Sequence, residues 1–147
     1  MQLSNRPGVV VVLGITQTLA WASSYYLPAM LAAPMARDLG LQTPTVFAAF
    51  SFALVISALL GPYAGRCIDR WGGRPVLMAT NLVFAAGLVL LGMANGLTGL
   101  LVAWAILGIG MGSGLYEAAF AGLVRLYGHD SRGAITGITL IGGFAST

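Results

Sequence analysis

Four apolar stretches, each long enough to cross a lipid bilayer, constrain this chain more than any other feature. They extend over about 9–35, 45–64, 75–94 and 100–127. The hydrocarbon core of a bilayer is ~30 Å thick, which ~20 helical residues cross. Only 7% of the residues are charged and 58% are hydrophobic, whereas soluble domains carry roughly 25% charged residues. We therefore expect an all-α, polytopic helical membrane protein.

A fifth apolar segment occupies about 134–147 and rises only about 21 Å as a helix, too little to cross. The chain is thus predicted to hold four complete transmembrane helices and the start of a fifth. The first stretch has an alternative interpretation as a cleaved signal peptide, with Arg6 as its positive start, Val9–Leu19 as its apolar part and Ala20–Ala22 as a small-residue cleavage site. We favour a span because the apolar sequence continues through Tyr25–Leu31, which a signal peptide does not need.

The basic residues predict the orientation of the chain. All seven are arginines, and they lie at the ends of the apolar runs. With the N-terminus inside, only Arg37, beside Asp38, faces outward. The six cytosolic ones are Arg6, Arg66, Arg70, Arg74, Arg125 and Arg132. Because cytosolic loops are rich in arginine, we expect a multi-pass protein of a bacterial-type inner (plasma) membrane with a cytoplasmic N-terminus. Without a continuous basic stripe, no nucleic-acid partner is expected.

A charged stretch at 65–74 separates the second and third apolar runs. It follows the pattern G-x-x-x-D-R-x-G-x-R, carried by Gly65, Asp69, Arg70, Gly72 and Arg74. This pattern resembles the signature loop of the major facilitator superfamily of secondary transporters, which joins their second and third transmembrane helices. The next-to-last position, often basic in that family, is Gly73 here, so one of the usual positive charges is absent.

The resemblance implies the N-terminal part of a transporter of about twelve helices, which moves a small solute by alternating access between two halves, as a symporter or antiporter driven by protons or another gradient. The remaining helices of the transporter would then be partners of this chain. Trp21–Gly40 and Phe50–Leu77 look most like the monocarboxylate-porter and oxalate-formate-antiporter branch, which implies an organic anion as substrate. A drug-like compound is the second substrate class. Drug antiporters have the motif R-x-x-Q-G in helix 4. With Gly108 as its glycine, Trp104 stands in place of the arginine and Leu107 in place of the glutamine, which counts against a drug antiporter of this type.

The resemblance also implies a gating role for the charged stretch. Asp69 would cap or pair with a helix end of the other half when the cytosolic side is closed, and Arg70 and Arg74 would join this network. Asp130, on the same side, is a natural partner for one of these arginines. Exposed ion pairs contribute only about 0 to 1 kcal/mol each, so such a network would bias a conformational equilibrium rather than hold the fold.

Two sets of polar residues inside the apolar runs are candidates for the substrate path. Glu117 is the only acidic residue well within a run, and ionisable groups there are costly enough to indicate a function. At helical spacing it shares a face with Ser113. A hydrogen-bonded structural glutamate is the alternative interpretation.

The second set is a polar and aromatic stripe on one face of the first helix, made of Gln17, Trp21, Ser24, Tyr25 and Pro28. The resemblance implies that helices 1 and 4 line the central cavity, where this stripe would touch substrate. Packing of Trp21 and Tyr25 against the fifth helix is the alternative.

Glycines recur at every second position of the fourth run. Gly108 with Gly112, and Gly110 with Gly114, form small-x-x-x-small pairs that let a neighbouring helix approach closely. A nucleotide-binding G-x-G-x-x-G motif is not formed, because Ser113 and Leu115 stand in the required third-glycine positions. These glycines therefore predict helix packing, and no cofactor is expected.

The chain lacks the residues for enzyme chemistry. One histidine, one cysteine and four scattered acids assemble no catalytic or metal-binding set. Two other functions fit four helices: an oligomeric membrane scaffold without transport, and a small dimeric exporter. The exporter is disfavoured because its carboxylate would be expected in the first helix, which has none.

Overall fold

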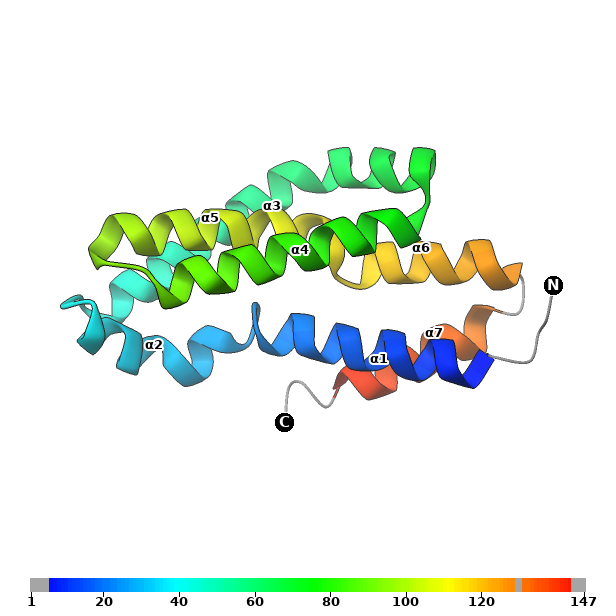
Figure 1. The fold of residues 1–147 in the computed structure, drawn as a ribbon, viewed down its shortest axis with the longest axis horizontal. Helices are drawn as coiled ribbons and strands as arrows, with labels where there is room; N and C mark the ends of the chain where they lie inside the picture. The colour runs from blue at the N-terminus through cyan, green and yellow to red at the C-terminus, as the bar shows by residue number, and fades with distance from the viewer. Residues whose placement is uncertain (1–5, 129–130, 144–147) are drawn as a thin grey trace.

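The computed structural model describes residues 6–128 and 131–143, and all regular elements within these ranges are α-helices. They are α1 (Arg6–Ala22), α2 (Leu27–Asp38), α3 (Thr43–Trp71), α4 (Gly73–Gly92), α5 (Gly96–Gly114), α6 (Tyr116–Tyr127) and α7 (Ser131–Gly143). α1 and α2 lie nearly end to end, as do α5 and α6, and the helices run along one common long axis (Figure 1).

Four spans in the described part of the chain are long and apolar enough to cross a membrane. They are Gly8–Asp38, Thr43–Trp71, Gly73–Gly92 and Gly96–Arg125, with 31, 29, 20 and 30 residues. The first consists of α1 and α2, and the fourth of α5 and α6. The prediction of an all-α, polytopic membrane fold with four spans is confirmed.

The charged stretch at 65–74 is mostly helical, so its prediction as a loop was wrong. α3 continues to Trp71, and α4 begins two residues later at Gly73. A helix can continue past the membrane surface through charged residues, since water solvates their side chains there. The chain turns only at Gly72, whose φ of 88° is a conformation that favours glycine. The connection between the second and third spans is therefore one residue long.

The first span is interrupted at residues 23–26, which the sequence had predicted to be helical. Pro28, at the start of α2, lacks an amide hydrogen and its ring disfavours the helical position of the carbonyl at Ser24. The Ser24 amide bonds the Trp21 carbonyl at 3.4 Å, three residues back, rather than the Ala20 carbonyl four residues back. The Ser24 hydroxyl donates to the carbonyl of Ala20, so a side chain satisfies a backbone group that the break has freed.

The fourth span is interrupted at Leu115, where φ and ψ are −80° and −151°. The prediction of one helix over about 100–127 was therefore wrong at this point, and the helix also begins earlier, at Gly96. Alternating glycines precede the break, and glycine costs up to about 1 kcal/mol relative to alanine in a helix. The segment is thus held helical by packing more than by its own preference.

The alternating glycines of α5 serve two different neighbours. A Cβ on Gly108 would lie 2.5 Å from the carbonyl oxygen of Ala53, and one on Gly112 would lie 2.8 Å from that of Ser57, both in α3. One turn earlier, the fully buried Trp104 meets Phe50 of α3 edge to face, with ring centroids 5.2 Å apart. α5 and α3 therefore pack backbone against backbone.

The other two glycines of α5 face α4. A Cβ on Gly110 would come within 3.2 Å of the Phe84 ring, and one on Gly114 within 2.6 Å of Thr80. Phe84 and Thr80 are themselves buried. α5 is consequently the central helix of the bundle, enclosed by α3 on one side and α4 on the other.

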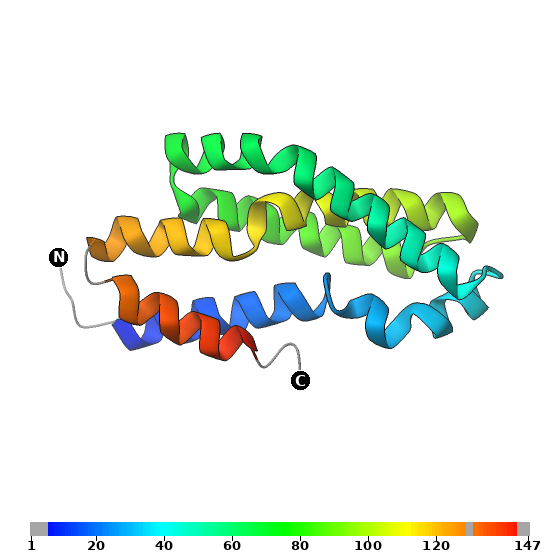
Figure 2. The ribbon, with the colours of Figure 1, turned by 180° about the vertical axis from the view of Figure 1, so that it is seen from behind.

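The first span lies at one side of this bundle. α1 packs along α7 and also contacts α6 (Figure 2). α2 packs against the first part of α3. α7 begins at Ser131, three residues before the predicted start of the fifth helix.

Candidate functional site: two helix breaks side by side

A hydrogen bond from α1 reaches the break in the fourth span. The amide nitrogen Nε2 of Gln17 donates to the carbonyl oxygen of Gly114 over 3.2 Å. That carbonyl ends α5, where no intrahelical donor is available. Gln17 is 1% exposed, and its Oε1 has no hydrogen-bond partner. A buried amide with an unused acceptor thus lies where α1 of the first span meets the break in the fourth span, a meeting point that we call the junction.

Aromatic rings surround this junction. The Trp21 ring lies 5.1 Å from that of Tyr116, the first residue of α6, and 5.3 Å from that of Tyr25. Tyr116 stacks on Phe120 at 5.2 Å, and Tyr25 meets Phe50 edge to face at 5.7 Å. The indole nitrogen of Trp21 is buried and without a partner. The junction therefore offers one free donor and one free acceptor within an aromatic wall.

The structure brings part of the predicted first-helix stripe to this junction, but its members differ in their contacts and in their exposure. Gln17 and Trp21 face the break in the fourth span. Ser24 is fully buried and occupied with the backbone of its own helix. Tyr25 is 42% exposed and remains the member with most access to an incoming molecule.

Glu117 lies in the first turn of α6 and is exposed. Because α6 starts afresh after Leu115, Glu117 is at a helix N-terminus, where a carboxylate is stabilised by the helix dipole. No side chain caps this N-terminus. The predicted common face with Ser113 does not form, since the two residues belong to different helices, and the Ser113 hydroxyl donates to the Ile109 carbonyl at 2.9 Å.

Three charged residues of the predicted gate, Asp69, Arg70 and Arg74, lie on either side of the turn at Gly72. Asp69 and Arg70 are exposed in the last turns of α3, and neither has an ion-pair partner among the described residues. Arg70 interacts favourably with the C-terminal end of α3. Asp130, the predicted partner of these arginines, lies outside the described residues.

The glycines of the charged stretch have three different environments. Gly65 lies within α3, and a Cβ there would meet nothing within 4 Å. Gly72 provides the turn and lies under the guanidinium of Arg125. A Cβ on Gly73 would lie 2.6 Å from the backbone nitrogen of Gly122 in α6, so any side chain at this position would require α6 to shift.

Three of these features were missed in the sequence. Tyr116 and Phe120 stand four residues apart, a spacing that places them on one helix face, and this signal was available. The contacts of Gly73 with α6 and of Arg125 with Gly72 join residues distant in sequence, and a single sequence carries no sign of them.

Comparison with known proteins assigns the family. The sequence profile described as Major Facilitator Superfamily matches residues 13–147. The chain belongs to this superfamily. No solved structure shows a significant match to it.

Of three curated relatives, two are named as a transporter and an antiporter, and the third is named for multidrug resistance. Monocarboxylate transporter 9 of Pongo abelii is 30% identical over 92 residues, covering 63% of this chain and 18% of that protein. Oxalate:formate antiporter of Oxalobacter formigenes is 29% identical over 140 residues, covering 95% and 33%. Multidrug resistance protein MdtL of Klebsiella pneumoniae (strain 342) is 37% identical over 87 residues, covering 59% and 22%. The matched region thus spans about a third or less of each relative.

Proposed function

We propose that this chain forms the N-terminal part of a secondary transporter that moves a small solute by alternating access, and that it is not an enzyme. The observation that carries the proposal is the contact between two interrupted transmembrane spans, in which Gln17 of α1 donates to the carbonyl of Gly114 at the end of α5. Broken helices with unpaired backbone groups are tolerated within a bilayer where they are buried in protein or line a water-filled cavity. Substrate sites of secondary transporters are built from such discontinuous helices.

The orientation that we propose has the N-terminus in the cytoplasm of a bacterial-type inner (plasma) membrane. The start of α1, the turn at Gly72 and the end of α6 lie at one end of the molecule (Figure 1). Arginines cluster there, whereas Arg37 at the end of α2 has Asp38 beside it. The excess of arginine supports a cytoplasmic assignment of the clustered end.

We infer an organic anion as the substrate class, with a drug-like compound as the alternative. Two of the relatives are named for carboxylates and one for drugs. The uncapped N-terminus of α6 carries a partial positive charge that favours an anion. The free indole N–H of Trp21 adds a donor close to it.

Glu117 supplies a means of coupling to protons. An ionised carboxylate in the first turn of α6 repels an anionic substrate at the same helix end, and a protonated one does not. Anion binding therefore favours protonation of Glu117, and by reciprocity protonation favours anion binding. Because this exposed carboxyl would be costly in contact with lipid, its location supports a cavity on this face of α6.

The test is transport by the full-length protein in vesicles, with Glu117→Gln and a matched Asp38→Asn variant. We expect Glu117→Gln to abolish uptake driven by a proton gradient, while Asp38→Asn, an exposed acid at the end of α2, retains it. Oxalate, formate and small monocarboxylates are the first substrates to try. Undiminished gradient-driven flux in Glu117→Gln would remove the coupling role from this residue.

A further inference from the structure

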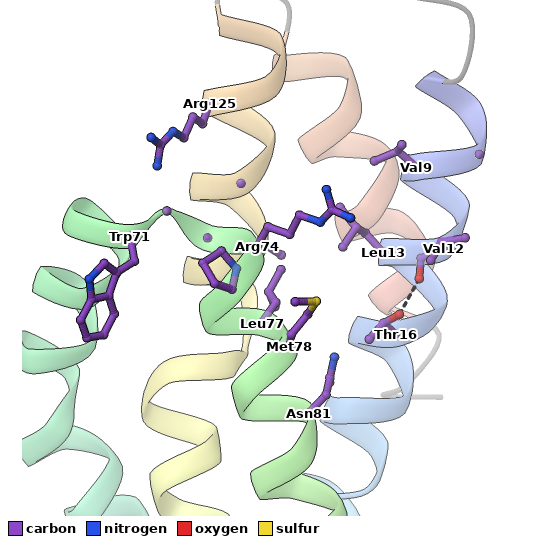
Figure 3. Close-up of a pocket in the computed structure, with 16 residues that line it drawn as sticks. Val9, Val12, Leu13, Thr16, Trp71, Arg74, Leu77, Met78, Asn81 and Arg125 are labelled. Atoms are coloured by element: carbon purple, nitrogen blue, oxygen red, sulfur yellow. Dashed lines mark hydrogen bonds between the residues drawn. The ribbon is translucent and has the colours of Figure 1, made fainter.

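A groove of about 1050 Å³ runs between α1 and α4, with α6 also contributing to its lining. Val12 and Leu13 form one wall, and Leu77 and Met78 form the other (Figure 3). Val12 is 63% exposed and Met78 is 59% exposed. The groove is thus an open apolar channel along the side of the bundle, and its lining includes neither Gln17 nor Gly114.

One end of the groove is positively charged. Arg74 and Arg125 line it there, and its lining residues include no aspartate or glutamate. The Arg74 side chain extends toward Leu13 of α1, whereas that of Arg125 points toward the turn at Gly72 (Figure 3). Neither arginine has an ion-pair partner among the described residues.

Two further features suit this end to a lipid headgroup. Trp71 lines it and is 61% exposed, and tryptophan is enriched where membrane meets water. The N-terminus of α4 begins there, with no side-chain cap, and its dipole adds partial positive charge. Below this end, Met78 lies about one helical turn deeper than Arg74 along α4, so the charged end and the apolar walls are in line.

We propose that this groove binds an anionic phospholipid of the cytoplasmic leaflet. Its phosphate contacts Arg74, Arg125 increases the positive potential at the same end, and an acyl chain lies between Val12 and Met78. The proposal rests on the cytoplasmic orientation given above, because that leaflet holds anionic lipid. A net-neutral phospholipid fits the apolar walls equally well but gains less from the two arginines, so the site discriminates by headgroup charge.

The experiment measures lipid retained by the full-length protein in native mass spectrometry, with phosphatidylglycerol and phosphatidylcholine as the probes. We expect preferential retention of phosphatidylglycerol. Each of Arg74→Gln and Arg125→Gln should weaken it up to about fivefold, the change that corresponds to about 1 kcal/mol per basic residue at a membrane surface. Arg74→Gln should have the larger effect because its side chain lies across the groove.

Arg66→Gln is the matched control, since Arg66 is near the same end but contacts Tyr63 outside the groove, 4.4 Å from its ring centroid. It should leave retention unchanged. Equal retention of the two lipids by the unaltered protein, or equal losses in all three variants, would overturn the proposal. Since this assay requires no transport, its failure leaves the proposed function standing, and loss of flux in the glutamate variant leaves the lipid site standing.

A second measurement asks whether protein fills the groove instead. In a full-length Cys67→Ala background, Met78→Cys should react with a lipid-soluble maleimide as fast as Leu82→Cys, a position on the same helix that is 73% exposed. Protection of the cysteine at 78 alone, in lipid of either headgroup, would show that another segment or a second copy covers the groove, and the lipid site would be refuted.

Discussion

Gly108→Ala tests the close packing of α5 against α3 at the centre of the bundle. The added methyl carbon would lie 2.5 Å from the carbonyl oxygen of Ala53 and 3.0 Å from its Cα. Both atoms belong to the backbone and cannot rotate away, so α3 must move by roughly 1 Å to reach ordinary van der Waals distance. Inserting a methylene into a packed interior costs typically 1–3 kcal/mol, and the rigid contact favours the upper end.

Alanine also has a helix preference about 1 kcal/mol better than glycine. The expected net destabilisation by Gly108→Ala is therefore about 2 kcal/mol. Gly65→Ala isolates the preference term, because Gly65 lies within α3 and a Cβ there meets no other atom within 4 Å. The control variant should gain up to about 1 kcal/mol, which gives a difference of about 3 kcal/mol between the two.

The assay is thermal unfolding of the full-length protein in detergent, followed by circular dichroism at 222 nm. With a shift of about 2 °C per kcal/mol, Gly108→Ala should unfold about 6 °C below Gly65→Ala. Equal midpoints for the two variants would refute the backbone contact between α5 and α3, and with it the assignment of the α5 glycines to two faces.

Three further predictions concern the junction, the turn and the orientation. Gln17→Leu should lower stability by about 1 kcal/mol through loss of its buried hydrogen bond, whereas Thr16→Val, which removes an exposed bond within α1, should change the unfolding midpoint little. Gly73→Arg restores the charge usual in the family but should reduce the yield of folded protein, because its Cβ meets the backbone of α6; a normal yield would contradict this contact. A membrane-impermeant maleimide should label Cys67 in inside-out vesicles only, and Asn95→Cys in a Cys67→Ala background from the outside only; the reverse pattern would invert the orientation.

The four spans could be predicted because they depend on composition over long windows. An apolar run of about twenty residues has few structures open to it in a bilayer. The ends of these helices could not be predicted as well, since charge was taken as the sign of a loop. Asp69 and Arg70 are compatible with a helix in water, and only Gly72 adopts a conformation that ends it.

The helix breaks could not be predicted from the sequence for a different reason. Pro28 accompanies a break, but Pro34 and Pro62 lie inside continuous helices, because neighbouring groups in membrane proteins can replace the lost hydrogen bonds. The break at Leu115 has no proline at all. Its freed carbonyl is satisfied by a residue 97 positions away in the sequence, a contact that no local pattern encodes.

That same contact gives the two interrupted spans a way to act together. Gln17 belongs to α1, whereas the carbonyl that it satisfies ends α5, so a movement of α1 relative to α5 breaks the bond and leaves two buried polar groups unpaired. Such a loss costs about 1–3 kcal/mol, comparable to the free-energy differences between conformations that ligands shift. A solute that bonds the free Oε1 of Gln17 or the indole N–H of Trp21 can offset this cost in one arrangement and not in another. Under the proposed function, the junction would thus favour one relative position of the two helices when solute is bound, as alternating access requires.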